Sequence, residues 1–121
     1  NMNEVATAVR EQLPLIEVVI NNHVLGMVRQ WQTLFYEKRY SSTVLNDGVD
    51  FVKLAEAMGA TGYRATSKEE FAEVFAKALT MKTPVVIDCV INCDDKVWPM
   101  VAPGAPISDC FDNKDMEKKG M

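Results

Sequence analysis

The stretch LIEVVINNHVLGMVRQWQTLFY, residues 15–36, joins an expected strand to an expected helix through two asparagines. It is the part of the sequence that indicates the fold class most clearly. Residues 15–20 are a nearly continuous run of apolar, β-branched side chains, which is typical of a parallel strand buried on both faces. Glu17 interrupts the run and indicates a position near an edge or end of the sheet. Residues 25–36 then carry apolar side chains at helical spacing. This unit indicates an α/β protein.

The rest of the chain continues the alternation of helices and strands. This order predicts an α/β fold with a parallel sheet, flanking helices and right-handed crossovers. Three strands make a thin sheet, and the chain begins inside a helix, so we expect one or more N-terminal strands to be missing. Besides the first unit, the sequence predicts helices over 3–13, 51–58 and 67–81, strands at 62–65 and 84–91, a loop over 36–48, and a frayed tail or short surface helix over 113–121.

Two of the predicted helices carry recognisable end signals. Asp50 is a candidate N-cap for the helix over 51–58, and Gly59 is placed to end it. Ser67 and Glu70 have the spacing of a capping box at the start of the next helix.

Composition excludes several classes of function. The chain has 121 residues with 17 acidic against 13 basic side chains, and the basic residues form no stripe, which disfavours nucleic-acid binding. No apolar run approaches the roughly 20 residues of a membrane span, and the polar start lacks the plan of a signal peptide. We therefore expect a cytoplasmic location. The three cysteines show no CxxC spacing, which argues against a disulfide framework or zinc site and predicts buried thiols.

The two asparagines stand where open parallel sheets bind ligands, beyond the carboxyl end of a strand. Neighbouring residues point in different directions, so one amide is expected to face a ligand and the other to brace the loop. An amide oxygen suits Mg²⁺, Gly26 permits close approach of backbone, and Met27 offers an adaptable apolar wall. Alternatively, Asn21 and Asn22 form a turn and an N-cap, which the residues alone favour because such turns are common.

A resemblance to a known family begins at these asparagines. NNHVLGMVRQWQ (21–32) resembles the end of the thiamine-diphosphate motif in the acetohydroxyacid synthase (acetolactate synthase) catalytic subunits. Further segments match in order: LFYEKRYS (34–41), DFVKLAEAMG (50–59) and WPMVAPGA (98–105). Thiamine enzymes broadly share the Asn-Asn ending, whereas the LGMVRQWQ continuation narrows the match to this family. The similarity covers about residues 3–112.

The resemblance implies specific roles for residues of this loop. Asn22 is implied to be a Mg²⁺ ligand through its side-chain oxygen, and Val24 a second ligand through its backbone carbonyl. The ion bridges the diphosphate of the cofactor. The implied cofactor-lining residues are Leu25, Gly26 and Met27.

Trp31 is implied to shape the pocket for the second 2-oxo acid. The alternative for Trp31 is a core aromatic on a helical stripe. His23, the only histidine, has no partner Ser, Cys or Asp at a recognisable spacing and is interpreted as a loop residue.

By resemblance, the complete enzyme decarboxylates pyruvate on thiamine diphosphate. It then joins the two-carbon unit to pyruvate or 2-oxobutanoate in branched-chain amino-acid biosynthesis. The family is homo-oligomeric, works with a regulatory small subunit, and binds FAD outside the segment matched here. The motif's opening Gly-Asp-Gly does not occur in these 121 residues. We therefore expect residues 1–112 to be the C-terminal part of the thiamine-diphosphate-binding domain, cut inside that domain and inactive alone, with 113–121 as a tail.

Two other interpretations stay open at the level of sequence. The segment could be a non-catalytic α/β module that self-associates through an unpaired sheet edge. It could also belong to another thiamine-diphosphate enzyme, an oxo-acid decarboxylase or oxidase.

Overall fold

The computed structural model describes residues 2–45 and 48–118. The predicted alternation of helices and strands is confirmed. The elements are α1 (Asn3–Arg10), β1 (Ile16–Asn21), α2 (Gly26–Phe35), α3 (Phe51–Ala57), β2 (Thr61–Ala65), α4 (Lys68–Leu79), β3 (Val85–Val90), a short 3-10 helix (Ile107–Asp109) and α5 (Asn113–Lys118).

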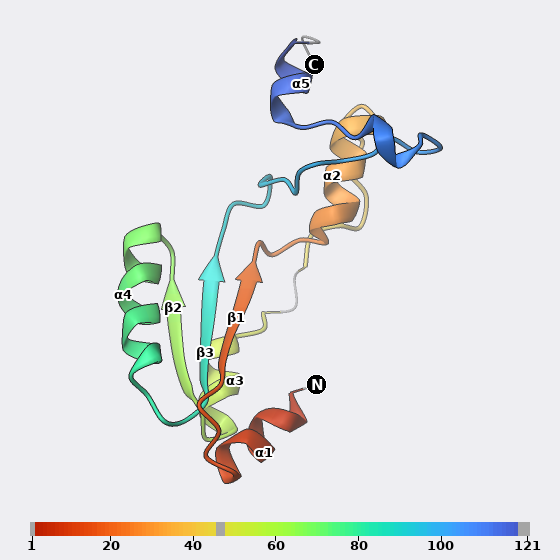
Figure 1. The fold of residues 1–121 in the computed structure, drawn as a ribbon. Coiled ribbons are helices and arrows are strands. Elements are labelled where there is room, and N and C mark those ends of the chain that lie inside the picture. The colour runs from red at the N-terminus through yellow and green to blue at the C-terminus, as the bar shows by residue number, and fades with distance from the viewer. Residues whose placement is uncertain (1, 46–47, 119–121) are drawn as a thin grey trace.

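The described strands form one parallel sheet in the order β1-β3-β2 (Figure 1). β3 is central, and its first four residues are buried. The burial on both faces predicted for residues 15–20 is wrong: β1 is an edge strand of this sheet, and Ile20 is 62% exposed. Glu17 lies exposed on β1, which is an edge strand of this sheet, so the prediction drawn from its charge is confirmed.

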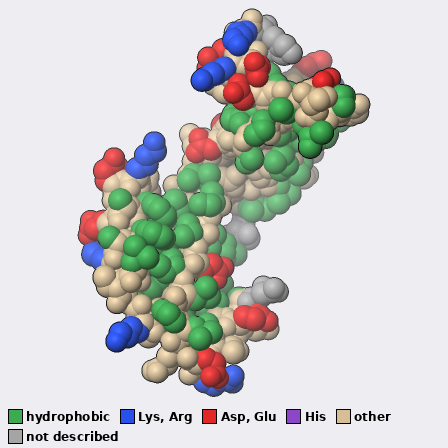
Figure 2. All heavy atoms as spheres, in the orientation of Figure 1, with side chains coloured by type: hydrophobic (Ala, Val, Ile, Leu, Met, Phe, Trp, Pro, Cys, Tyr) green, Lys and Arg blue, Asp and Glu red, His purple; other side chains and the backbone are tan. Residues whose placement is uncertain are grey.

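Helices cover the two faces of the sheet and form two small cores. On one face, α4 packs its Ala78 against Ala65, Val85 and Ile87. On the other face, Ala55 of α3 packs with Ala60 and Val86, and Val5 and Val9 of α1 extend this cluster. Figure 2 shows hydrophobic side chains over the sheet and around α2, with acidic and basic side chains mostly at the margins.

The predicted helix ends are confirmed, with one difference. Asp50 Oδ1 accepts hydrogen bonds from the N–H groups of Val52 and Lys53, both at 3.2 Å, and Gly59 follows α3 with φ at 86°. Helix α1 ends at Arg10, earlier than the predicted residue 13, and Gln12 adopts a positive φ of 52°. The helix closes in a Schellman-type turn, in which the Gln12 N–H donates to the Val9 carbonyl at 3.1 Å and the Leu13 N–H to the Ala8 carbonyl at 3.0 Å. Pro14 follows this turn and cannot continue a helix.

The capping box of α4 is only half of the predicted arrangement. Ser67 Oγ accepts from the Glu70 N–H at 3.1 Å, as predicted. The Glu70 carboxylate instead reaches the backbone N–H and the hydroxyl of Thr66, both at 2.7 Å, one residue before the cap. These hydrogen bonds from Thr66 hold the pKa of Glu70 below its ordinary value.

The predicted tail contains a short helix. Residues 113–118 form α5, while 119–121 lie outside the described residues.

The three cysteines are less buried than the sequence predicted. The expectation of buried thiols is wrong for Cys110, which is exposed, and Cys89 and Cys93 are only half-buried. Cys110 follows the 3-10 helix in an irregular segment that belongs to neither core, and it lines an open pocket with Leu34 and Phe35.

Gly62 on β2 lies against the backbone of α3, and this contact yields a stability prediction. A Cβ at position 62 would stand 2.8 Å from the Val52 carbonyl oxygen and 2.9 Å from its Cα. Because backbone cannot rotate away, we expect Gly62→Ala to lower the free energy of unfolding by about 1–3 kcal/mol, as overpacking does. Denaturant unfolding of the purified protein measures this. Adding Val52→Ala trims the Val52 side chain but not the backbone contacts, so full restoration by this second change would contradict the argument.

Candidate functional site

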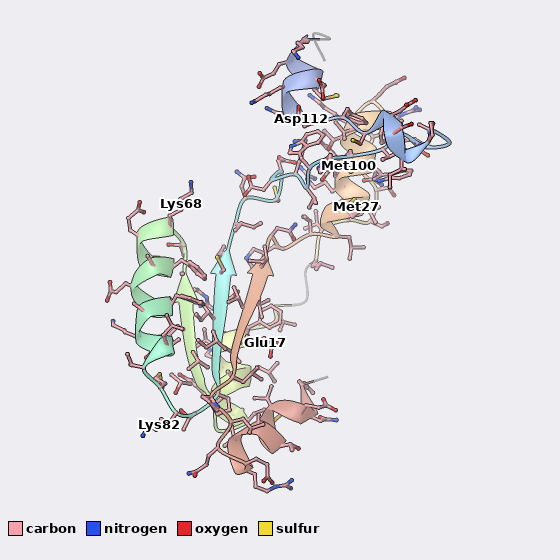
Figure 3. The ribbon with its side chains drawn as sticks, viewed as in Figure 1. Glu17, Met27, Lys68, Lys82, Met100 and Asp112 are labelled. Atoms are coloured by element: carbon pink, nitrogen blue, oxygen red, sulfur yellow. The ribbon has the colours of Figure 1, made fainter. Side chains whose placement is uncertain are left out.

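Helix α2 and the segment after β3 lie beyond the carboxyl ends of the strands, away from both covered faces of the sheet (Figure 1). Figure 3 shows Met27 of α2 and Met100 of the later segment in this upper part of the molecule. The connection from β1 to α2, residues 21–25, is called the asparagine loop below. It therefore stands where ligands of parallel sheets bind.

The two asparagines play different parts in this loop. Asn21 is 8% exposed, and its Nδ2 donates to Asp88 Oδ1 of β3 at 3.0 Å. Its Oδ1 accepts from the backbone N–H of His23 at 3.2 Å. Asn21 is thus the amide that braces the loop.

Asn22 is half-buried and makes a second turn of the same type. Its Oδ1 accepts from the Val24 N–H at 3.2 Å, and His23 between them has a positive φ of 56°. The turn interpretation of the asparagines is therefore confirmed. Their predicted role as an N-cap is wrong, because Leu25 occupies the N-cap position of α2 without a side-chain hydrogen bond. Both asparagines hydrogen-bond the turn that lies before the helix begins, and neither caps the helix.

Two oxygen atoms of the asparagine loop stay available as acceptors. Within residues 2–45 and 48–118, no hydrogen bond ends on the Val24 carbonyl oxygen. Asn22 Oδ1 receives a single donor there, although an amide oxygen has two lone pairs. Hard divalent cations bind neutral amide oxygens and backbone carbonyl oxygens, so these two oxygen atoms are suitable ligands for Mg²⁺.

A second segment holds the asparagine loop from outside. The Leu25 N–H donates to the Thr43 carbonyl at 2.8 Å, and the Leu45 N–H donates to the His23 carbonyl at 2.9 Å. Val24 and Val44 form the antiparallel bridge between these bonds, and Thr43 is 2% exposed. The sequence predicted only a loop over 36–48, because single bridges leave no periodic pattern.

Gly26 is the first residue of α2 and permits a close contact within the loop. A Cβ at this position would stand 2.5 Å from Asn22 Nδ2. The sequence predicted that Gly26 allows close approach of backbone, whereas the nearest group among the described residues is the side-chain amide of Asn22.

Met27 and Trp31 lie one turn apart on α2 and line an open groove of about 530 Å³. Met27 is 48% exposed, whereas Trp31 is half-buried and packs edge-on against Phe35 with ring centroids 5.4 Å apart. Trp31 therefore has the geometry of a groove wall and that of a packed aromatic. The groove, called the α2 groove below, is lined by Met27, Val28, Trp31, Gln32, Tyr36 and Arg39.

Helix α2 is fixed in place by the segment that follows β3. Gln30, only 4% exposed, donates to the Val97 carbonyl at 2.9 Å and accepts from the Val97 N–H at 2.8 Å. Arg29 Nε donates to Asp94 Oδ1 at 2.8 Å, and its guanidinium lies 4.1 Å from the Tyr40 ring centre. The hydrogen bond to Asp94 raises the pKa of Arg29, and the same bond lowers the pKa of Asp94.

Sequence reasoning missed a chain of polar side chains that begins at Asn21 and is buried only at Asn21 and Asp88. Asp88 Oδ2 accepts from Nε of the exposed Arg64 at 3.0 Å, and Arg64 Nη2 donates to Asp50 Oδ1 at 2.8 Å. Asn21, Asp88, Arg64 and Asp50 make up this polar chain. The available signal was an acidic residue inside the most apolar strand, since buried carboxylates need partners.

Two further properties of the described part of the chain bear on function. No three His, Cys, Asp or Glu side chains gather there in a way that could hold a metal ion. None of the described helices is long and apolar enough to cross a membrane.

Comparison with known proteins identifies the family. Residues 1–89 match the family described as "Thiamine pyrophosphate enzyme, C-terminal TPP binding domain". The chain is 49% identical over 106 residues to an acetolactate synthase of Mycobacterium avium, covering 84% of this chain and 17% of that protein. It is 41% identical over 112 residues to the acetolactate synthase isozyme 2 large subunit of Escherichia coli K12, covering 93% of this chain and 20% of that protein.

Solved structures of similar fold include benzoylformate decarboxylase from Polynucleobacter necessarius, with a TM-score of 0.69 and 25% identity over 80% of this chain and 18% of that one. The thiamine diphosphate-dependent 4-hydroxybenzoylformate decarboxylase of Rhodococcus jostii RHA1 gives a TM-score of 0.66 at 25% identity, over 75% of this chain and 17% of that one. The chain spans at most 20% of the length of these four proteins. The sequence match over most of the chain, with the shared fold, shows that this chain belongs to the thiamine pyrophosphate enzymes, within the family of their C-terminal TPP binding domain.

Proposed function

We propose that this chain supplies part of the thiamine-diphosphate and Mg²⁺ site of an acetolactate synthase large subunit, as the C-terminal part of that subunit. The observation that carries the proposal is the asparagine loop, whose Asn22 and Val24 oxygens remain available among the described residues at the carboxyl end of β1. The identity of 49% and 41% to two acetolactate synthases supports this enzyme among the thiamine enzymes.

In this proposal the Asn22 side-chain oxygen and the Val24 carbonyl bind Mg²⁺. Further ligands would come from outside these 121 residues, because the Gly-Asp-Gly whose aspartate the resemblance implies as another ligand does not occur in the chain. Helix α2 supports an anionic ligand at this place. Its first turn has no side-chain cap and no acidic residue, so its N–H groups and the positive end of its dipole favour negative charge.

Leu25, Gly26 and Met27 line the cofactor in this proposal, and Trp31 in the α2 groove contacts the second 2-oxo acid. Thiamine diphosphate supplies the carbanion chemistry when it is bound. The chain's own residues bind the metal, orient the cofactor and exclude water from its reactive side. The exposed Met27 and half-buried Trp31 offer the apolar surface that this last role needs.

The wider assignments follow the same proposal. Residues 1–112 are the C-terminal part of the cofactor-binding domain, and 113–121 are its tail. The complete subunit is a cytoplasmic homo-oligomer that acts on 2-oxo acids in branched-chain amino-acid biosynthesis. It binds FAD outside this segment and associates with a regulatory small subunit.

Product analysis of the full-length subunit on pyruvate tests the reaction. We expect acetolactate as the main product with thiamine diphosphate and Mg²⁺ present. The likeness of fold to two decarboxylases favours one competing function, since a decarboxylase releases the two-carbon unit as an aldehyde. Acetaldehyde as the main product, or acetate from an oxidase, would overturn the synthase assignment.

A further inference from the structure

We propose that Asp88 is a positioning residue for the metal site, acting through the Asn21 amide on the loop that presents Asn22 and Val24. This inference rests on the proposed function. The side chain of Asp88 is 2% exposed and lies on the central strand β3, where its register partners are Val19 of β1, two residues before Asn21, and Arg64 of β2. Both of its oxygens are engaged, one by Asn21 Nδ2 and the other by Arg64 Nε, each at 3.0 Å.

The charge of Asp88 fixes the direction of the hydrogen bonds. A carboxylate paired with a guanidinium has no proton to give, so it only accepts. Asn21 must therefore turn its NH₂ group toward Asp88, which leaves its Oδ1 facing the His23 N–H at 3.2 Å. An amide at position 88 would keep its oxygen toward Arg64 Nε and present its NH₂ group to Asn21. Because the Asn21 oxygen is held by the His23 N–H, two NH₂ groups would then face each other, and Asn21 would have to give up one of its two hydrogen bonds.

The Asn21 orientation determines the turn that follows. With the His23 N–H held by Asn21, His23 takes its positive φ of 56° and the Val24 N–H reaches Asn22 Oδ1. This geometry is the one that leaves the Val24 carbonyl without a hydrogen bond among the described residues.

Arg64 holds the second oxygen of Asp88 from the neighbouring strand β2. Arg64 of β2 bonds Asp88 through Nε and Asp50 through Nη2, and Asp50 in turn caps α3. The turn after β1 is thereby tied across the sheet to both β3 and β2 (Figure 1).

The test compares two Asp→Asn changes at opposite ends of Arg64 in the full-length subunit. We expect Asp88→Asn to lower Mg²⁺ affinity roughly 10- to 100-fold, the range typical of groups that orient a metal ligand. Calorimetric titration of Mg²⁺ into apo-subunit saturated with thiamine diphosphate measures it. Asp50→Asn is the matched control. Its hydrogen bonds with the Val52 and Lys53 N–H groups and with Arg64 all end on Oδ1, which asparagine retains. Of its contacts, only the 3.8 Å ion pair of Oδ2 with the exposed Lys53 ammonium is lost, so Mg²⁺ affinity should not change.

A swap of the two residues separates positioning from a structural role. In the double variant Asn21→Asp with Asp88→Asn, the amide now on β3 donates to the carboxylate now at the end of β1 and accepts from Arg64. That carboxylate still accepts from the His23 N–H. The direction is fixed again, so Mg²⁺ affinity should return close to the parental value. The proposal is wrong if the double variant does not regain Mg²⁺ affinity. It is also wrong if Asp88→Asn and Asp50→Asn lower Mg²⁺ affinity equally. Should Asp88→Asn not fold, the affinity of the swap decides alone.

Asn22→Ala distinguishes failure of this inference from failure of the proposed function. If Asn22→Ala binds Mg²⁺ with parental affinity, the proposed metal site is wrong, and so is the proposed role of Asp88. If Asn22→Ala binds Mg²⁺ more weakly but Asp88→Asn has parental affinity, the metal site stands and only the positioning role is wrong.

Discussion

Asn22→Ala in the full-length subunit should weaken Mg²⁺ binding by roughly 100-fold or more, and thiamine diphosphate binding with it. Groups that merely orient a metal ligand typically account for roughly 10- to 100-fold, and Asn22 is proposed as a ligand itself. The change also removes the acceptor of the Val24 N–H, so it loosens the turn that presents the Val24 carbonyl. Calorimetric titration of Mg²⁺ into the apo-subunit saturated with cofactor measures the affinity directly.

Two variants make this result specific to Asn22. His23→Asn changes the neighbouring exposed residue and keeps its positive φ of 56°, which asparagine tolerates, so Mg²⁺ affinity should stay parental. Asn22→Asp retains an oxygen for both the Val24 N–H and the metal, so it should bind Mg²⁺ far better than Asn22→Ala. Equal affinity in Asn22→Ala and the parent would exclude Asn22 from the site.

The sequence was informative wherever a structure depends on neighbours along the chain. The cap at Asp50, the stop at Gly59 and the strand over 85–90 follow from short-range rules of side-chain hydrogen bonding, positive φ and apolar runs. The order of elements follows as well, because short segments each signal their own type. Even the two asparagines could be placed at the end of a strand, where ligands of parallel sheets bind.

What the sequence could not predict depends on residues distant in the chain. Asn21 and Asn22 are chemically identical, and only Asp88, 67 positions after Asn21, decides which of them braces the loop. The contacts of Thr43 and Val44 with the loop are single bridges without a periodic signal. One difference is local rather than distant. The capping box predicts that the Glu70 carboxylate accepts from the Ser67 N–H, but the Thr66 N–H one residue earlier is an equally acceptable donor and binds it instead.

Gly26→Ala should lower Mg²⁺ affinity roughly tenfold or more, the lower end of the range for groups that orient a metal ligand, while leaving the stability of the subunit near the parental value. The new Cβ would stand 2.5 Å from Asn22 Nδ2, well inside van der Waals contact. That atom ends a short side chain, so the Asn22 amide rotates away and the backbone stays. Alanine also favours the first turn of α2 over glycine by up to about 1 kcal/mol, which offsets residual crowding. Metal titration and thermal unfolding of the same samples separate the two effects.

A double-mutant cycle with Asn22→Ala decides whether Gly26 acts through Asn22. Once the Asn22 amide is gone, a Cβ at position 26 loses its nearest neighbours, so Gly26→Ala should cause no further loss of Mg²⁺ affinity in that background. Strong coupling of this kind places the Asn22 amide over the start of α2 in the working enzyme. Equal losses in both backgrounds would mean that the methyl group meets the cofactor itself, because the nearest atoms that the chain places around that Cβ all belong to Asn22.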